Sequence, residues 1–69
     1  MFDKKRFMAQ LVLSDVSMKE LAKKLGIDES TLYRKVNEDG RFSRKEINAM
    51  LSILKIEDPY PIFFADELA

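Results

Sequence analysis

The sequence has no cysteine and no histidine among its 69 residues. Their absence excludes disulfides, thiolate chemistry and the usual zinc ligands from this chain. The apolar runs are far shorter than the roughly 20 residues of a membrane-spanning helix. No apolar segment of the signal-peptide kind follows the charged start at residues 1–6. We therefore expect no membrane association, no metal ion, no cofactor and a cytoplasmic location.

Glycine and proline are also scarce, with two of each, so the chain has no glycine-rich phosphate loop. The carboxylate pairs Glu38-Asp39 and Asp66-Glu67 are the nearest approach to a catalytic acid–base site. A general acid or base needs a cleft and a shifted pKa, and a helical chain of this size leaves little room for either. We expect that the protein is not an enzyme.

Charge is balanced overall but unevenly distributed. Residues 1–55 carry all 12 basic residues and 8 of the 12 acidic ones, a net charge of +4, and residues 56–69 carry −4. A basic body suits an anionic partner only if its positive groups share a face. A mixed, solvated surface accounts for the composition equally well, so charge alone does not identify a partner.

Four helix starts are marked in a similar way. In each, an apolar residue comes directly before a residue that can cap a helix, and a second apolar residue stands at the fourth helical position. This is the pattern of an N-cap with a hydrophobic staple. Two of the four are full S-x-x-E capping boxes, at Ser17–Glu20 and Ser43–Glu46. The four capping residues are Asp3, Ser17, Asp28 and Ser43.

Apolar residues after these caps recur at helical spacing. They predict helices at about 3–13, 18–25, 29–37 and 44–54, and Asp58-Pro59-Tyr60-Pro61 cannot continue the last one. The apolar group at 62–64 suggests one further helical turn, with a β-ribbon as the alternative. We predict an all-α domain of four to five helices over residues 1–57, and a tail at 58–69 that either covers the core or forms a dimer contact.

The segment 17–37 has the form of a helix-turn-helix. Ala22 supplies the small residue needed where two helices approach, and Gly26 tolerates the positive φ of the turn. Ile27 and Leu32 would fill the inside of the corner. At about 100° per residue, Leu32 and Val36 mark the buried side of the second helix.

Arg34 then points outward, with Ser30 and Asn37 beside it and Thr31 and Tyr33 on the flanks. This face is polar and rich in hydrogen-bond donors. The DNA major groove admits one helix and presents acceptors on guanine, which an outward arginine matches well. A solvated surface arginine is the alternative reading of Arg34.

The stretch from Leu21 to Leu32, LAKKLGIDESTL, resembles the helix-turn-helix of the Cro/lambda-repressor (XRE) family. The family pattern has Ala, then Gly four residues later, an aliphatic next and another five further on, as Ala22, Gly26, Ile27 and Leu32 do here. The resemblance covers about residues 4–56 and extends to small phage or prophage regulators of the Gram-positive type.

The resemblance implies a lambda-repressor-like fold and a homodimer that places one helix of each subunit in the major groove of a pseudo-palindromic double-stranded DNA operator. It implies base-reading residues at Glu29, Ser30, Tyr33 and Arg34. Phosphate contacts are expected from Ser17, Thr31, Asn37 and, on charge, Arg41.

The sequence departs from the family pattern at three positions. Met18 stands where the family often has Gln, and Lys35 stands where it often has an apolar residue, so that Val36 takes the buried role. Glu29 is acidic at a leading base-reading position, where it could accept from cytosine or simply favour the helix N-terminus.

We therefore expect a DNA-binding transcriptional regulator, a small Cro-like phage or prophage repressor, with a second phage regulator as a candidate partner. The alternative is a protein-binding modulator on the same scaffold, such as an anti-repressor or co-repressor. A third reading is an antitoxin-like or designed single domain without a DNA target. We expect any dimer to use the fourth helix and the tail, or to form mainly on DNA.

Overall fold

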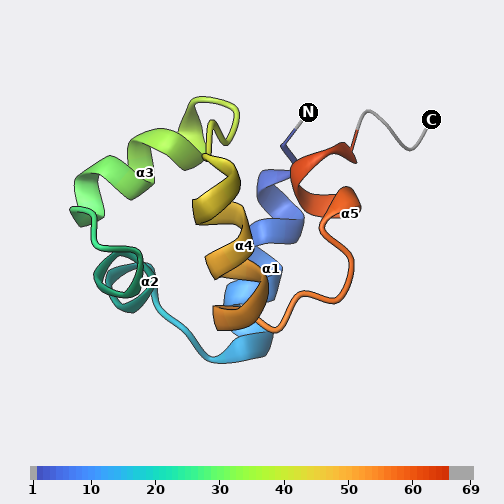
Figure 1. Ribbon diagram of the computed structural model, residues 1–69, viewed down its shortest axis with the longest axis horizontal. Helices are drawn as coiled ribbons and strands as arrows, with labels where there is room; N and C mark the ends of the chain where they lie inside the picture. Colours follow the sequence, from blue (N-terminus) through green and yellow to red (C-terminus); the bar gives the residue numbers. More distant parts are fainter. Residues whose placement is uncertain (1, 66–69) are drawn as a thin grey trace.

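The computed structural model describes residues 2–65, and this part of the chain is helical with no strand (Figure 1). The predicted all-α fold is confirmed, and the helix bounds agree with the prediction to within one residue. The predicted turn in the tail is a short fifth helix. The helices are α1 (Lys4–Ser14), α2 (Met18–Leu25), α3 (Glu29–Asn37), α4 (Arg44–Ile53) and α5 (Tyr60–Phe63).

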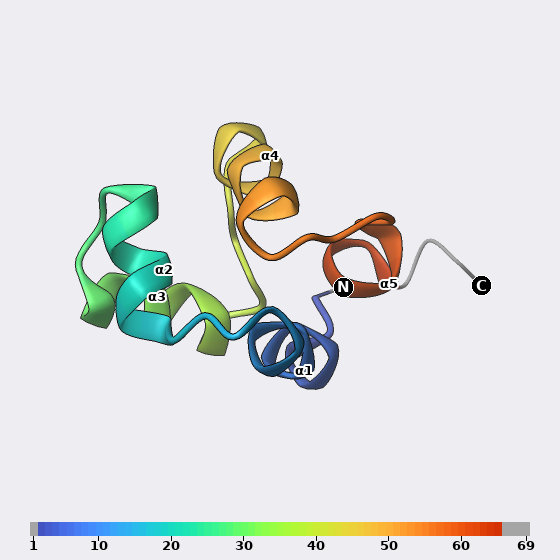
Figure 2. The same ribbon diagram turned by 90° about the horizontal axis from the view of Figure 1, so that it is seen from below.

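The helix-turn-helix lies at one end of the molecule and the tail at the other. In both views α2 and α3 lie side by side at one end, α4 crosses the middle, and α5 lies against the N-terminal side of α1 (Figures 1 and 2). The main helix contacts are α2 with α3, α2 with α4, and α1 with α5. This arrangement leaves α3 at the edge of the molecule.

Three of the four predicted N-caps form as expected. Ser17 and Ser43 each accept a hydrogen bond from the third helical N–H at 3.1 Å, and both capping boxes are complete. Asp3 accepts from the N–H of Arg6 at 3.0 Å. Asp28 does precede α3, but its side chain makes no capping bond, so this detail of the prediction was wrong.

Left-handed residues end three of the helices. Gly26 has φ +74°, as predicted, but Asp15 (φ +56°) and Lys55 (φ +54°) adopt the same conformation without being glycine. The next residue in each case is aliphatic, and its N–H bonds to a carbonyl five residues back at 2.9–3.0 Å, the geometry of a Schellman motif. α4 therefore ends by its own cap, before the prolines.

One core joins all five helices. The largest fully buried side chains are Phe7, Leu21, Leu32, Met50 and Leu54. An aromatic cluster extends this core towards the tail: the ring of Phe2 lies 5.3 Å from that of Phe7 and 5.8 Å from those of Phe42 and Phe63, centroid to centroid. The three chain segments that carry these rings are thereby held together.

The tail covers the core, at least as far as residue 65. Ile62 and Phe63 are buried, and the N–H of Asp3 donates to the carbonyl of Ile62 at 2.7 Å. Of the two roles left open for the tail, its apolar residues here act as a lid. Residues 66–69 of the predicted tail lie outside the described part of the chain.

Gly40 is required by the packing of the N-terminus. It has φ +61°, and a Cβ at this position would collide with the side chain of Phe2. Gly26 has a similar φ, but a Cβ there would meet no atom within 4 Å. A substitution at Gly26 therefore tests the backbone conformation alone, whereas one at Gly40 tests the conformation and the contact with Phe2 together.

We predict that Gly40→Ala lowers the free energy of unfolding by about 2–4 kcal/mol, because it adds a clash to the left-handed strain. Gly26→Ala, the matched control, should cost only about 1–2 kcal/mol. Urea unfolding followed by circular dichroism measures both. Equal losses for the two variants would show that Phe2 does not pack over Gly40.

Candidate nucleic-acid interface

The helix α3 is fixed from one side only. Leu32 and Val36 are buried in the core, which confirms their predicted inward direction. They lie four residues apart, so they occupy one face of the helix. The opposite face of α3 lies outside the core and is available to a partner, although Asn37 at its end is hydrogen-bonded to Lys4.

That opposite face is polar and exposed. Ser30, Arg34 and Asn37 are exposed, and the Tyr33 side chain is 45% accessible. At about 100° per residue, Arg34 lies opposite the midpoint between Leu32 and Val36, while Ser30 and Asn37 lie within about 60° of it. Tyr33 lies on the flank. The structure thus brings three of the predicted contact residues onto one helix face, with Tyr33 at its edge, about 100° from Arg34.

Two other predicted residues of α3 lie away from the centre of this face. Thr31 lies about 60° from Arg34, as Asn37 does, but on the other side of the face, and it is half-buried. Glu29 is exposed, but it lies about 140° around the helix from Arg34. As an acidic residue in the first turn, it interacts favourably with the positive end of the helix dipole. A direct contact of Glu29 with a base stays a prediction.

The start of α2 provides a second polar group. Ser17 is exposed, and its hydroxyl both accepts from the N–H of Glu20 and lies 3.2 Å from the Glu20 carboxylate. Ser17 is therefore already engaged in capping. The first two N–H groups of any α-helix have no partner within the helix, so the backbone of Met18 and Lys19 is the more available donor for a phosphate.

Two basic residues flank α3 near its C-terminal end. Arg41 is exposed in the loop to α4. Lys4, at the start of α1, donates from Nζ to Oδ1 of Asn37 at 2.7 Å. Lys4 was not among the predicted contact residues. Lys4 and Asn37 are 33 positions apart in the sequence, and no local pattern predicts that they lie close together.

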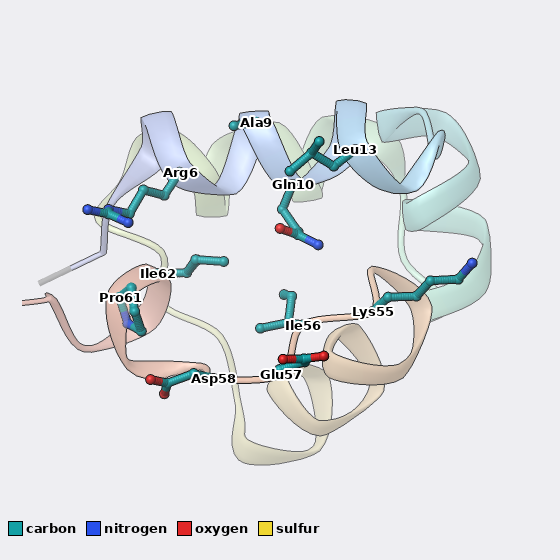
Figure 3. Close-up of a pocket in the computed structure, with 10 residues that line it drawn as sticks. All are labelled: Arg6, Ala9, Gln10, Leu13, Lys55, Ile56, Glu57, Asp58, Pro61 and Ile62. Atoms are coloured by element: carbon teal, nitrogen blue, oxygen red, sulfur yellow. The ribbon is translucent and has the colours of Figure 1, made fainter.

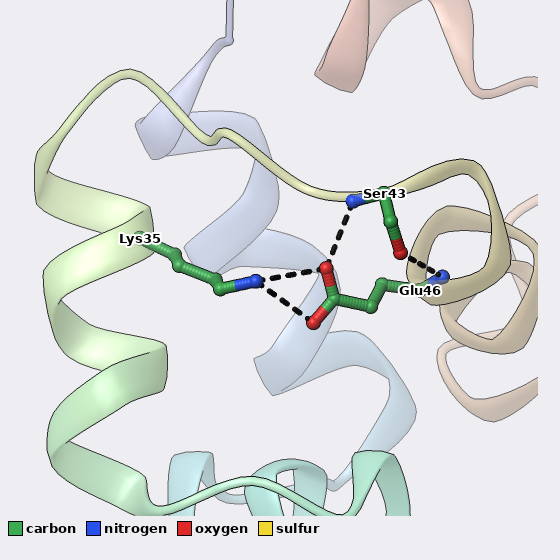
Figure 4. A network of polar contacts seen from close by, with 3 residues as sticks. All are labelled: Lys35, Ser43 and Glu46. Carbon is green, nitrogen blue, oxygen red and sulfur yellow. Dashed lines mark hydrogen bonds and ion pairs between the residues drawn. The ribbon is translucent and has the colours of Figure 1, made fainter.

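The Lys35 ammonium fastens α3 to α4 (Figure 4). Its Nζ donates to both carboxylate oxygens of Glu46, at 2.9 and 3.0 Å, and lies 5.9 Å from the centre of the Phe42 ring. The Lys35 and Glu46 side chains are only 25% and 16% accessible. The family departure at Lys35 therefore has a structural explanation: the position packs inward through an ion pair.

Glu46 has two roles at once. Its carboxylate accepts from the N–H of Ser43 at 2.8 Å, which completes the capping box of α4, and from Lys35 on α3. Burial raises the pKa of this carboxyl, but the hydrogen bonds from Ser43 and Lys35 and the Lys35 charge outweigh it, so the pKa is lowered overall. Glu46 is thus ionised at neutral pH, where it can pair with the Lys35 ammonium.

Three grooves of the described chain are lined by residues outside α3. One, of about 430 Å³, runs between α1 and residues 55–62 (Figure 3). Its polar lining includes Arg6, Lys55, Glu57 and Asp58, and the side chain of Gln10 bonds to the carbonyl of Leu54 beside it at 2.7 Å.

Within residues 2–65 no cluster of acidic side chains could hold a metal ion. No described helix is long and apolar enough to cross a membrane.

A family model described as the antitoxin Xre-like helix-turn-helix domain matches residues 6–55. The matched span covers well over half of the 69 residues. It includes the whole of α2, α3 and α4. No curated protein and no solved structure matches the chain.

We predict that Glu46→Gln lowers stability at pH 7 by about 1–2 kcal/mol, because Gln can still cap α4 but cannot pair with the Lys35 charge. The pKa of Glu46 is lower in the folded state, so its contribution is present above the ordinary value of 4.5 and is lost as the pH falls through the folded pKa. Urea unfolding at pH 7 and in acid should show the two proteins converging.

Glu20→Gln is the matched control, since Glu20 closes the capping box of α2 on the exposed surface. It should cost less at pH 7 than Glu46→Gln. A stability difference between wild type and Glu46→Gln that is unchanged in acid would contradict the ion pair with Lys35.

Proposed function

The chain belongs to the antitoxin Xre-like helix-turn-helix family, and we propose that it is a sequence-specific DNA-binding regulator that inserts α3 into the major groove. The observation that carries the proposal is the exposed polar face of α3 around Arg34, on a helix whose other side is buried. Arginine pairs in bidentate fashion with O6 and N7 of guanine. Ser30 and Tyr33 are the neighbouring base readers in this proposal.

Phosphate contacts in the proposal come from groups on both sides of α3. The N-terminus of α2 offers free backbone N–H groups and the positive end of a helix dipole. Lys4 and Asn37 form a hydrogen-bonded pair beside the other end of α3, and Arg41 follows in the exposed loop. Such contacts orient a protein on the duplex, while the bases specify the sequence.

A symmetric operator requires two copies. The described chain has one helix-turn-helix and a longest dimension of 33 Å, whereas half-sites in this binding mode lie roughly 34–36 Å apart. One chain therefore reads one half-site. We propose a homodimer on a short inverted repeat.

The finer role is proposed from the architecture of the described chain. Within residues 2–65 the helix-turn-helix shares its single core with α1, α4 and α5. Bound to an operator, such a protein acts by occupying DNA, so we propose a Cro-like phage or prophage repressor of promoter access. It acts in the bacterial cytoplasm, without a cofactor and without catalysis.

A second candidate is supported by the description of the family as antitoxin-like and by the net charge of zero. It is a protein-binding modulator on the same scaffold, which docks on another regulator or on an effector protein. It predicts a tight protein partner and no DNA binding that depends strongly on salt.

The test of the proposal begins with selection of bound sequences from random DNA, which supplies the operator. Arg34→Ala should then weaken binding to the selected DNA by about 1–3 kcal/mol and relax the preference at one base position. Fluorescence anisotropy measures the affinity. For the wild type, the logarithm of the affinity should fall linearly with the logarithm of the salt concentration, since phosphate contacts release counterions.

Arg6→Ala is the charge-matched control. Arg6 is exposed and lines the groove between α1 and residues 55–62 (Figure 3), away from the outward face of α3. Its loss should change affinity little and leave the base preference intact. An Arg34→Ala protein that binds the selected DNA as tightly and with the same preference would contradict the proposal.

A further inference from the structure

The outer surface of α1 is unusually apolar. Val12 and Leu13 are 81% and 79% accessible, and Met8 is 37% accessible. The remaining exposed large apolar residues of the described chain, Tyr33 and Tyr60, lie singly on α3 and α5. A group of exposed apolar side chains on a small protein generally marks an interaction surface, whereas scattered ones do not.

The fold itself does not use these side chains. α1 is held by Phe7 and Leu11, which are buried, and by Gln10, which bonds to the carbonyl of Leu54. Val12 lies about 140° around the helix from Phe7, on the side away from the core. In Figure 2, α1 lies at the margin of the molecule with no other element beyond it.

Charged residues stand at the two ends of this surface. Lys5 lies one turn before Met8, and Asp15 lies just after the last turn; both are exposed. Lys5 and Val12 lie within about 20° of each other around the helix, with Ala9 close by. From one end to the other the surface is thus basic, apolar and acidic.

We propose that this face of α1, made of Lys5, Met8, Ala9, Val12 and Asp15, binds the same face of a second copy of the chain, with the two helices antiparallel. Only an antiparallel pair places the basic end of each helix against the acidic end of the other. Centred near Gln10, the pairing sets Lys5 opposite Asp15 and Met8 opposite Val12, twice each by symmetry.

The dimensions indicate a weak dimer. α1 has 11 residues and is therefore about 16 Å long. Two such helices bury an area at or below the low end of stable interfaces, which is about 1,200 Å² in total. Ala9 lies near the middle of the contact, and its small side chain permits close approach of the helices. We expect dissociation constants on the order of micromolar.

This surface differs from the α4 and tail interface expected from the sequence. The apolar tail residues Ile62 and Phe63 are buried within the chain and are not free for a partner. This proposal rests on the proposed function, because the second copy would read the second half-site. Dimerisation is measured without DNA, so a protein that stays monomeric would not contradict the DNA-binding proposal.

The first experiment is sedimentation equilibrium of the full chain without DNA, from micromolar to millimolar concentration. The wild type should show a monomer–dimer equilibrium, and Val12→Asp should weaken it at least about tenfold. Tyr60→Asp, at an exposed apolar residue on α5, is the matched control and should leave it unchanged. Circular dichroism verifies that each variant is folded.

The second experiment uses the charges. Lys5→Glu and Asp15→Lys should each weaken self-association, because each places like charges opposite one another. A mixture of the two single variants should dimerise more strongly than either alone, and the double variant Lys5→Glu/Asp15→Lys should regain self-association. Because each single variant shifts the net charge by two and the double variant restores it, the exposed pair Lys45→Glu and Glu38→Lys is the charge-matched control. These variants lie off α1 and should leave self-association unchanged, which separates the antiparallel register from a general change in net charge.

Three results would overturn the proposal. The wild type could remain monomeric up to millimolar concentration, which would assign the α1 surface to a different protein or to no partner. Tyr60→Asp could dissociate the dimer while Val12→Asp does not, which would place the interface at α4 and α5. The mixed charge variants could fail to associate although each is folded, which would exclude the antiparallel pairing.

Discussion

The burial of Leu32 and Val36 is the constraint on which the rest of the structure depends. These two side chains attach α3 to the core along a single stripe, and every other residue of the helix is placed relative to them. Because the stripe is narrow, the residues on the opposite side of α3 do not pack in the core. Polar residues such as Arg34, Ser30 and Asn37 can therefore occupy that side without loss of core packing.

A stripe of two residues does not by itself fix the orientation of a helix, and the ion pair between Lys35 and Glu46 adds the missing restraint. It lies to the side of the stripe, so it resists rotation of α3 about its own axis. Glu46 also completes the capping box of α4 with Ser43. The position of α3 is therefore coupled to the start of α4, and this contact restrains the helix that carries Arg34.

Local features of the fold could be predicted from the sequence, and features that join distant segments could not. The capping boxes placed the starts of α2 and α4 correctly, and the aliphatic spacing placed α3, because capping and periodicity act within a few residues. Lys35 was recognised only as a departure from the family, since nothing near it identifies Glu46 as its partner. The pairing of Lys4 with Asn37 was missed for the same reason. The left-handed conformation of Asp15 accompanies the packing of Val16 against the core, which a local pattern does not reveal.

The central claim is that the outward face of α3 and the start of α2 form the DNA-binding surface. The most direct measurement is an NMR titration of the ¹⁵N-labelled chain with its selected DNA. The account predicts that the largest changes in amide chemical shift fall on the first turn of α2 and on Ser30 to Arg34, with α5 little affected. Binding that leaves the amides of α3 unperturbed would contradict it.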